Sequence, residues 1–186
     1  MHGIMAFFLG IGLAATCGFR VFVPLLGLSI ANHVGHLPLS HGFEWIGSWP
    51  ALIAFGIATI FEVGAYFIPW LDHLLDTIAT PAAVVAGTVI TASVLGELSP
   101  YLRWPLGIIA GGGVAGAVQG SSVLVRGTST ATTGGLGNPL VSAGELAASI
   151  IGTIISIVLP IVAIVLVCLI MYFIFRRISR RRAHST

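Results

Sequence analysis

The sequence predicts an all-α, polytopic integral membrane protein with about five or six spans, some of them broken or re-entrant. Hydrophobic residues make up 56% of the 186 residues, and the mean hydropathy is +1.05. Charged residues make up only 8%, against about 25% in an ordinary soluble domain. Because so few charges cannot cover the surface of a soluble fold, the bilayer is the expected solvent.

The first two spans are expected over residues 4–31 and 50–68. The first apolar run continues past Arg20, and the residues before it lack Arg and Lys, so it predicts a span and not a cleaved signal peptide. The second span is expected to begin at Trp49-Pro50, because proline is favoured at the first helical position.

The next spans are expected to start with the same Xaa-Pro pattern. Thr80-Pro81 predicts a third span over 81–97, and a short helix over 70–78 precedes it. Trp104-Pro105 predicts a fourth span over 105–125.

A Gly/Thr-rich linker is expected over 126–138. Asn138 would end it and cap the next helix through its side-chain oxygen. The last apolar stretch, 139–175, is too long for one straight crossing. Pro160 is therefore expected to divide it into a shorter, re-entrant helix and a final span.

We expect one transmembrane domain over residues 1–175 and a basic tail over 176–186. The tail holds five of the eight basic residues, namely Arg176, Arg177, Arg180, Arg181 and Arg182. Because cytoplasmic flanks of membrane helices carry an excess of Arg and Lys, the C-terminus is predicted to be cytoplasmic. The same cluster predicts contact with anionic lipid headgroups.

A faint internal repeat relates the two halves of the chain. The segment "GLAATCG" before Arg20 resembles "GVAGAVQG" before Arg126. Each half then continues to an Xaa-Pro pair and a glutamate, Glu62 and Glu145. Small transporters are often built from two repeats with a site between them, which favours an inverted repeat. The match is short, so a chance match also stays open.

Ionisable side chains inside the predicted spans are the first candidates for a site, because a charge at mid-bilayer must be paired, neutralised or facing water. Glu62 lies well inside the second span, where it suits proton coupling. Arg20 lies near the middle of the first span and cannot lose its charge. Arg20 therefore needs a carboxylate such as Glu62 or Asp72, a cluster of carbonyls, or an anionic ligand.

The sequence "PWLDHLLD" brings together two acids and an imidazole. Asp72 and Asp76 share one helix face, with His73 beside them. Proton or ion coupling, or an ion pair with Arg20 or Arg103, is favoured over an incomplete metal site. We expect a break in the second span that directs these acids toward the protein centre, although a plain helix start would also favour them.

Three motifs together resemble a bacterial family of small multi-pass membrane proteins that is catalogued as a domain of unknown function. They are "GLAATCGFRVFVPLL", "FEVGAYFIPWLDHLLDTI" and "TSTATTGGLGNPLVSAGE". The resemblance covers most of residues 4–160, excludes the basic tail, and implies no established activity. The resemblance implies that the protein lies in the bacterial cytoplasmic (inner) membrane. The residues that match the family pattern are Arg20, Glu62, Pro69, Asp72, Asp76, Asn138, Pro139 and Glu145.

The function expected from these residues is that of a small secondary transporter or translocase. Arginines and helix N-termini favour an anionic, phosphate-bearing substrate, of which a lipid-linked phosphate is one kind. The candidate substrate-binding residues are Arg20, Arg126 and Asn138. The candidate residues for proton or cation coupling are Glu62, Asp72, His73, Asp76 and Glu145.

Two other function classes stay open. One is a non-catalytic membrane scaffold or assembly factor, and the other is a membrane-embedded, metal-dependent enzyme. No cofactor, catalytic residue or nucleic-acid partner is expected. The expected partners are membrane lipids and the substrate, and a homo-oligomer stays open.

Overall fold

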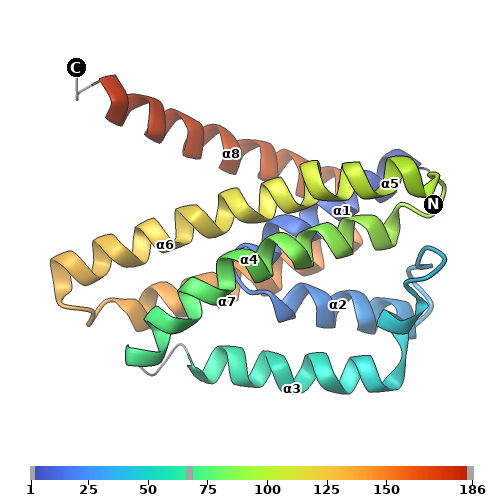
Figure 1. The fold of residues 1–186 in the computed structure, drawn as a ribbon, viewed down its shortest axis with the longest axis horizontal. Coiled ribbons are helices and arrows are strands. Elements are labelled where there is room, and N and C mark those ends of the chain that lie inside the picture. The colour runs from blue at the N-terminus through green and yellow to red at the C-terminus, as the bar shows by residue number, and fades with distance from the viewer. Residues whose placement is uncertain (1–2, 66–68, 184–186) are drawn as a thin grey trace.

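The computed structural model is a bundle of helices that run mostly along one common direction (Figure 1). The structure describes residues 3–65 and 69–183, with side chains for 3–65 and 77–176. Within these residues every regular element is helical. The predicted all-α fold is therefore confirmed.

The helical elements follow one another along the chain. They are α1 (Gly3–Cys17), α2 (Phe22–His33), the 3-10 turn η1 (Glu44–Gly47), α3 (Trp49–Ala65), α4 (Pro69–Val94), α5 (Pro100–Leu106), the π-helical segment η2 (Gly107–Gly112), α6 (Gly113–Thr133), α7 (Asn138–Val158) and α8 (Pro160–Ala183). Because α5, η2 and α6 follow each other directly, they form one long helical stretch.

Three helical stretches are long and apolar enough to cross a membrane. They are residues 77–94 of α4, the stretch 100–133, and α7. Apolar segments of 10–17 residues add α1, α2, α3 and the first part of α8. This helix content is that of a polytopic membrane protein.

Helix α1 occupies the centre of the bundle. It packs against α4, α6, α7 and α8, whereas α3 lies at the edge beside α2 (Figure 1). Leu9 and Leu13 of α1, Leu28 of α2 and Ile90 of α4 belong to the main apolar core. The C-terminal end of α1 lies beside α6 and α7, where Gly18 approaches Ala115 and Thr16 contacts Ser149.

Helix α4 crosses the π-helical segment at very short range. A β-carbon on Gly87 would lie 2.7 Å from the β-carbon of Ala115 and 2.8 Å from the carbonyl oxygen of Gly111. Small residues allow such backbone approach between membrane helices. The π-helical segment lies at this crossing, and such insertions are frequent at functional sites.

The predicted first span, 4–31, is broken into α1 and α2 at residues 18–21. At this break a β-carbon on Gly18 would lie 2.6 Å from the carbonyl oxygen of Ala115 in α6. The prediction of one uninterrupted span was therefore wrong, and Arg20 lies at the break instead of inside a helix. The local sequence is apolar enough to continue, so the cause of the break lies in contacts from other helices.

Pro81 and Pro105 do not begin helices, contrary to prediction. Helix α4 runs without interruption from Pro69 to Val94 and includes the predicted helix 70–78. Pro105 lies inside α5. A proline inside a helix removes one hydrogen bond, whereas a break in an apolar solvent leaves several backbone groups unpaired. Continuing the helix therefore costs less.

The segment 126–138 is mostly helical instead of the predicted linker. Helix α6 continues to Thr133, and the hydroxyls of Thr128 and Thr133 donate to carbonyls four residues earlier at 2.8 and 2.7 Å. These bonds satisfy the hydroxyls within the helix, so the threonines do not end it. Gly134, with φ 63°, ends α6 in the left-handed conformation that favours glycine.

Pro160 divides the last apolar stretch, as predicted. Helix α7 ends at Val158 and α8 begins at Pro160. With 21 residues, α7 is long enough to cross a membrane, so it is not the shorter helix that we expected. The backbone of α8 continues to Ala183, so the arginine-rich segment extends the last helix.

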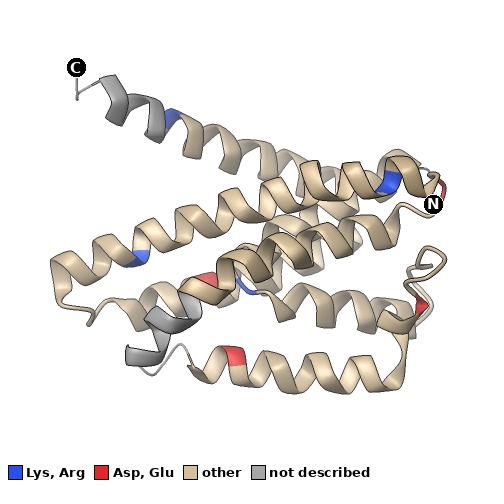
Figure 2. Ribbon diagram, in the orientation of Figure 1, with Lys and Arg blue, Asp and Glu red and all other residues tan. Residues whose placement is uncertain are grey.

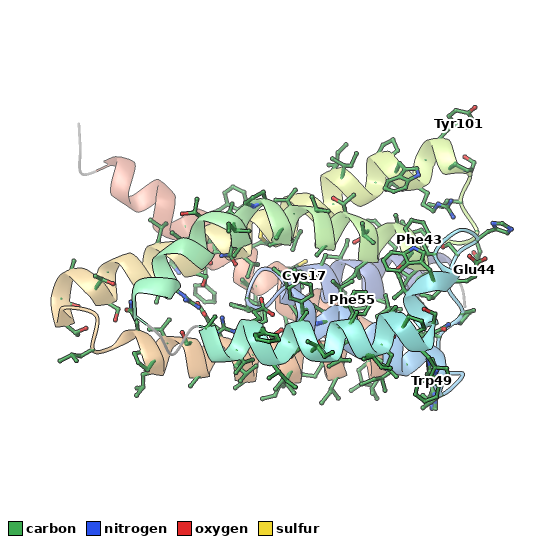
Figure 3. All side chains as sticks on the ribbon, turned by 60° about the horizontal axis from the view of Figure 1, so that its bottom comes forward. Cys17, Phe43, Glu44, Trp49, Phe55 and Tyr101 are labelled. Atoms are coloured by element: carbon green, nitrogen blue, oxygen red, sulfur yellow. The ribbon has the colours of Figure 1, made fainter. Side chains whose placement is uncertain are left out.

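Aromatic side chains gather at one end of the bundle. Figure 3 shows Phe43, Trp49 and Tyr101 at this end, and Trp49 and Tyr101 are 66% and 91% exposed. Trp104 packs against Phe43, with ring centroids 5.8 Å apart. The C-terminus lies at the other end (Figure 1). Such an aromatic cluster is typical of a membrane–water interface.

The close approach of α4 to the π-helical segment and the start of α6 predicts that substitution of two glycines has different effects on stability. Gly87→Ala would force its β-carbon against Ala115 and Gly111, and we expect a loss of about 1–3 kcal/mol, the usual cost of overpacking. Gly120→Ala is the matched control, because nothing lies within 4 Å of an added β-carbon there. Thermal unfolding in detergent should show a lower Tm for Gly87→Ala alone, and equal Tm values would contradict the close crossing.

Candidate functional site

One face of α7 is polar and buried. It carries Asn138, Ser142, Glu145, Ser149, Thr153 and Ser156. Their spacing of three or four residues places them on one side of the helix. Helix α7 is thus amphipathic in the reverse sense of a soluble helix, with its polar side toward the protein and its apolar side outward.

Glu145 and Arg126 form a buried ion pair between α7 and α6. Arg126 is 3% exposed and Glu145 is 7% exposed. The guanidinium Nε donates to Glu145 Oε1 at 3.1 Å, and Nη2 donates to Oε2. Ser122, one helical turn before Arg126, also donates its hydroxyl to Oε1. This two-pronged geometry is the strongest form of a carboxylate–arginine contact.

Arg20 reaches the same carboxylate from the break between α1 and α2. Its Nη2 lies 3.7 Å from Glu145 Oε2 and donates to the carbonyl oxygen of Ser142 at 2.9 Å. The side chain of Arg20 is 2% exposed. Two arginines, which cannot lose their charge, therefore share one carboxylate inside the protein.

Glu62 of α3 holds the backbone of the same break. Its Oε1 accepts a hydrogen bond from the Val21 amide at 2.7 Å, and its Oε2 accepts one from the Phe22 amide at 3.1 Å. These amides lie at the N-terminus of α2, where the first N–H groups of a helix lack partners and the helix dipole favours a negative charge. A carboxylate from another helix thus accepts hydrogen bonds from backbone amides at the break, which lipid could not do.

The four charges form one interior cluster. Figure 2 shows charged segments on α3 and α6 partway along the bundle, within long uncharged helices. Glu62 interacts electrostatically with both Arg20 and Arg126. Two positive and two negative charges then balance while both glutamates are ionised. Protonation of either glutamate would leave the cluster with a net positive charge.

The hydroxyl of Ser142 is buried beside the cluster. The residue is 1% exposed, and its carbonyl oxygen already accepts from Arg20. Its hydroxyl finds no hydrogen-bond partner within the described part of the chain. Because buried polar groups in proteins are nearly always paired, this hydroxyl marks a place where a water or a ligand oxygen fits.

Thr16 connects the polar face of α7 to the end of α1. Its carbonyl oxygen accepts from the hydroxyl of Ser149 at 3.2 Å, and its hydroxyl lies 3.3 Å from that of Thr153. The hydroxyls of Ser149 and Thr153, in the part of the polar face toward the aromatic end, therefore have hydrogen-bond partners. The charged cluster and the Ser142 hydroxyl, which has no hydrogen-bond partner among the described residues, lie nearer the other end of α7.

The predicted cap at Asn138 was wrong. Helix α7 begins at Asn138 itself, Gly137 occupies the cap position, and no side chain caps the helix. The Asn138 amide nitrogen instead donates to the Thr130 hydroxyl at 3.0 Å. Asn138 therefore ties the start of α7 to the end of α6, one turn beyond Arg126.

The acidic turn at the start of α4 lies where its side chains are not described. Asp72, His73 and Asp76 are therefore outside the described side chains, and their coupling role stays a prediction. The backbone places them in the first turns of α4 instead of in a break of the second span. Arg103 lies in α5, after the C-terminal end of α4. Its guanidinium lies 5.4 Å from the ring centre of Phe43.

Sequence reasoning missed the polar face of α7 as a unit. The signal was present, because serine, threonine, asparagine and glutamate recur at helical spacing through an otherwise apolar segment. The sequence suggests Glu62 and Asp72 as carboxylate partners for Arg20, whereas the structure brings Arg20 to Glu145 and engages Glu62 with backbone amides. Among the described residues, no group of three or more metal-ligating side chains occurs.

Residues 7–180 match the family described as a domain of unknown function, DUF4126, and the chain belongs to this family. The match extends beyond the segment that the motifs covered and includes much of the arginine-rich end. No curated protein and no solved structure matches the chain.

The shared carboxylate predicts an asymmetric response to mutation. Glu145→Met leaves two buried arginines against each other and should cost about 3–5 kcal/mol, as for other broken buried pairs. Arg126→Met should cost less, because Glu145 keeps Arg20. The double variant should be more stable than Glu145→Met, since it removes one of the two opposed arginines.

Reversible unfolding in detergent gives these three free energies. Arg103→Met serves as the control, because its cation–π contact with Phe43 is worth only about 1 kcal/mol. Additive costs in the double variant would contradict a shared carboxylate.

Proposed function

We propose that this DUF4126 protein is a small secondary transporter or translocase that moves an anionic, phosphate-bearing substrate together with a proton. The observation that carries this proposal is the pair of buried arginines, Arg20 and Arg126, that share the carboxylate of Glu145. Arginine forks match the oxygens of phosphate as well as those of carboxylate. Glu145 therefore occupies the position that an anionic substrate would take.

Protonation of Glu145 is the step that opens the site. While Glu145 is ionised, it satisfies both arginines and the interior is balanced in charge. When Glu145 takes up a proton, it loses its attraction for the arginines, and a substrate anion can take its place. A proton and an anion then enter together, so the cluster is never left with unpaired charge.

Ser142 supplies a specific contact in this scheme. Its hydroxyl, beside the Arg20 guanidinium, would donate to a substrate oxygen once the anion is bound. The helix break would supply the movement that release requires, because the amides of Val21 and Phe22 are held by the carboxylate of Glu62 from another helix. Protonation of Glu62 would weaken that hold and let α2 move relative to α1.

The arginine-rich end of α8 supports an orientation in the bacterial cytoplasmic membrane. Positive residues favour the cytoplasmic side, and Figure 1 places the C-terminus at the end of the bundle where α6 ends. The charged cluster would then lie nearer the cytoplasmic face. The aromatic end with Trp49 and Tyr101 would face outward.

Proteoliposome flux tests this proposal. Labelled inorganic phosphate and dodecyl phosphate are the two probes, so that a free phosphate and a lipid-like phosphate are distinguished. We expect uptake of one probe to accelerate when the outside is more acidic than the inside. Glu145→Gln should greatly reduce that dependence on the pH gradient, because the amide at the substrate position cannot exchange a proton. Folded protein that moves neither probe would favour the scaffold function.

Two serines provide a sharper comparison. Ser142→Ala should leave the Tm unchanged and weaken the apparent affinity for the transported probe roughly two- to tenfold, the effect of one lost hydrogen bond. Ser149→Ala is the control, because its hydroxyl already donates to the Thr16 carbonyl and its loss should affect stability instead. Equal affinities in wild type and Ser142→Ala would place the substrate elsewhere.

A further inference from the structure

Helices α6 and α8 diverge toward the C-terminal end of the chain (Figure 1). A groove of about 860 Å³ lies between them. On the α8 side, Phe173 and Phe175 line it, and on the α6 side Leu124 and Val125 do so. Toward the end of α6 the lining becomes polar, with the hydroxyls of residues such as Thr132.

We propose that this groove binds an anionic phospholipid, with an acyl chain between α6 and α8 and the headgroup at the arginine-rich end of α8. The site lies on a different face of α6 from Arg126, which is buried toward α7. It therefore goes beyond the transport proposal and does not depend on it.

The dimensions of the groove fit one leaflet of a bilayer. Its lining on α6 runs from Ala117 to Thr133, which is about 24 Å of helix at 1.5 Å per residue. That is more than half of the roughly 30 Å hydrocarbon core, so it accommodates one acyl chain with its glycerol region. Apolar side chains would contact the chain, and threonine oxygens at the end would face the ester region.

Charge decides which lipid binds. Arg176 follows directly on the lining residue Phe175, is exposed, and lies with its guanidinium 6.0 Å from the ring centre of Tyr172. Four more arginines follow within residues 177–182. Each basic residue close to the membrane surface attracts anionic lipid. The groove should therefore select phosphatidylglycerol over phosphatidylcholine.

A second copy of the chain fits this groove less well. It would bring the same excess of arginine to the same end of the membrane. The exposed acids among the described side chains, Glu44 and Glu97, lie near the aromatic end, away from the arginines. An anionic headgroup removes the repulsion, whereas a second α8 would add to it.

The experiment measures lipid binding directly. Purified protein is placed in liposomes that contain chain spin-labelled phosphatidylglycerol or phosphatidylcholine, and the motionally restricted fraction is recorded. We expect wild type to favour phosphatidylglycerol by at least about fivefold, the effect of one basic residue near the surface. Replacing all five tail arginines by glutamine should bring this ratio close to one.

A pair of glycines on α6 separates the groove from the rest of the surface. Gly120 lines the groove, whereas Gly113 lies on the same helix outside it, and nothing lies within 4 Å of an added β-carbon at either position. Gly120→Leu should remove the restricted phosphatidylglycerol component, and Gly113→Leu should keep it. Leu124→Trp is a second groove-filling variant, should Gly120→Leu fail to fold.

Three results would overturn the proposal. Equal binding of the two lipids by wild type would remove the charge argument. An unchanged restricted component in folded Gly120→Leu would place the lipid elsewhere. If Gly120→Leu converts a dimer into a monomer without changing lipid binding, a second copy occupies the groove. None of these results depends on whether the protein transports phosphate.

Discussion

The ion pair of Glu145 with two arginines is the interaction on which the rest of the interior depends. Arg20 comes from the break between α1 and α2, Arg126 from α6, and the carboxylate from α7. In an apolar interior, each of these charges would be costly alone. The need to bring them together determines how the three segments meet, and Glu62 completes the arrangement by satisfying the backbone that the break exposes.

Much of the fold follows from patterns that depend on few residues. Hydropathy and the low charge content predicted helices in a membrane, and Xaa-Pro pairs located the starts of α3 and α7 correctly. Pro160 divided the last apolar stretch as expected. The buried positions of Arg20, Glu62 and Glu145 were also predictable, because ionisable groups in membrane helices turn toward the protein interior.

The rest could not be predicted from local sequence, because it depends on contacts between distant segments. The break at residues 18–21 exists because Glu62 supplies the missing acceptors, and nothing near the break reveals this. Pro81 stays inside α4, since the membrane penalises a break more than it penalises one lost hydrogen bond. The threonines after Arg126 continue α6, because their hydroxyls bond to their own helix. The pairing of Arg20 with Glu145 likewise depends on contact between segments that lie far apart in the sequence.

The central claim is that substrate replaces the Glu145 carboxylate at the two arginines as Glu145 takes up a proton. Infrared difference spectra, recorded in lipid at constant pH on addition of phosphate or dodecyl phosphate, test it most directly. We expect loss of an ionised carboxylate band and gain of a protonated carboxyl band in wild type, with both changes absent in Glu145→Gln. Binding of a phosphate probe with no carboxyl change, or with the same change in Glu145→Gln, would contradict replacement of the Glu145 carboxylate by substrate.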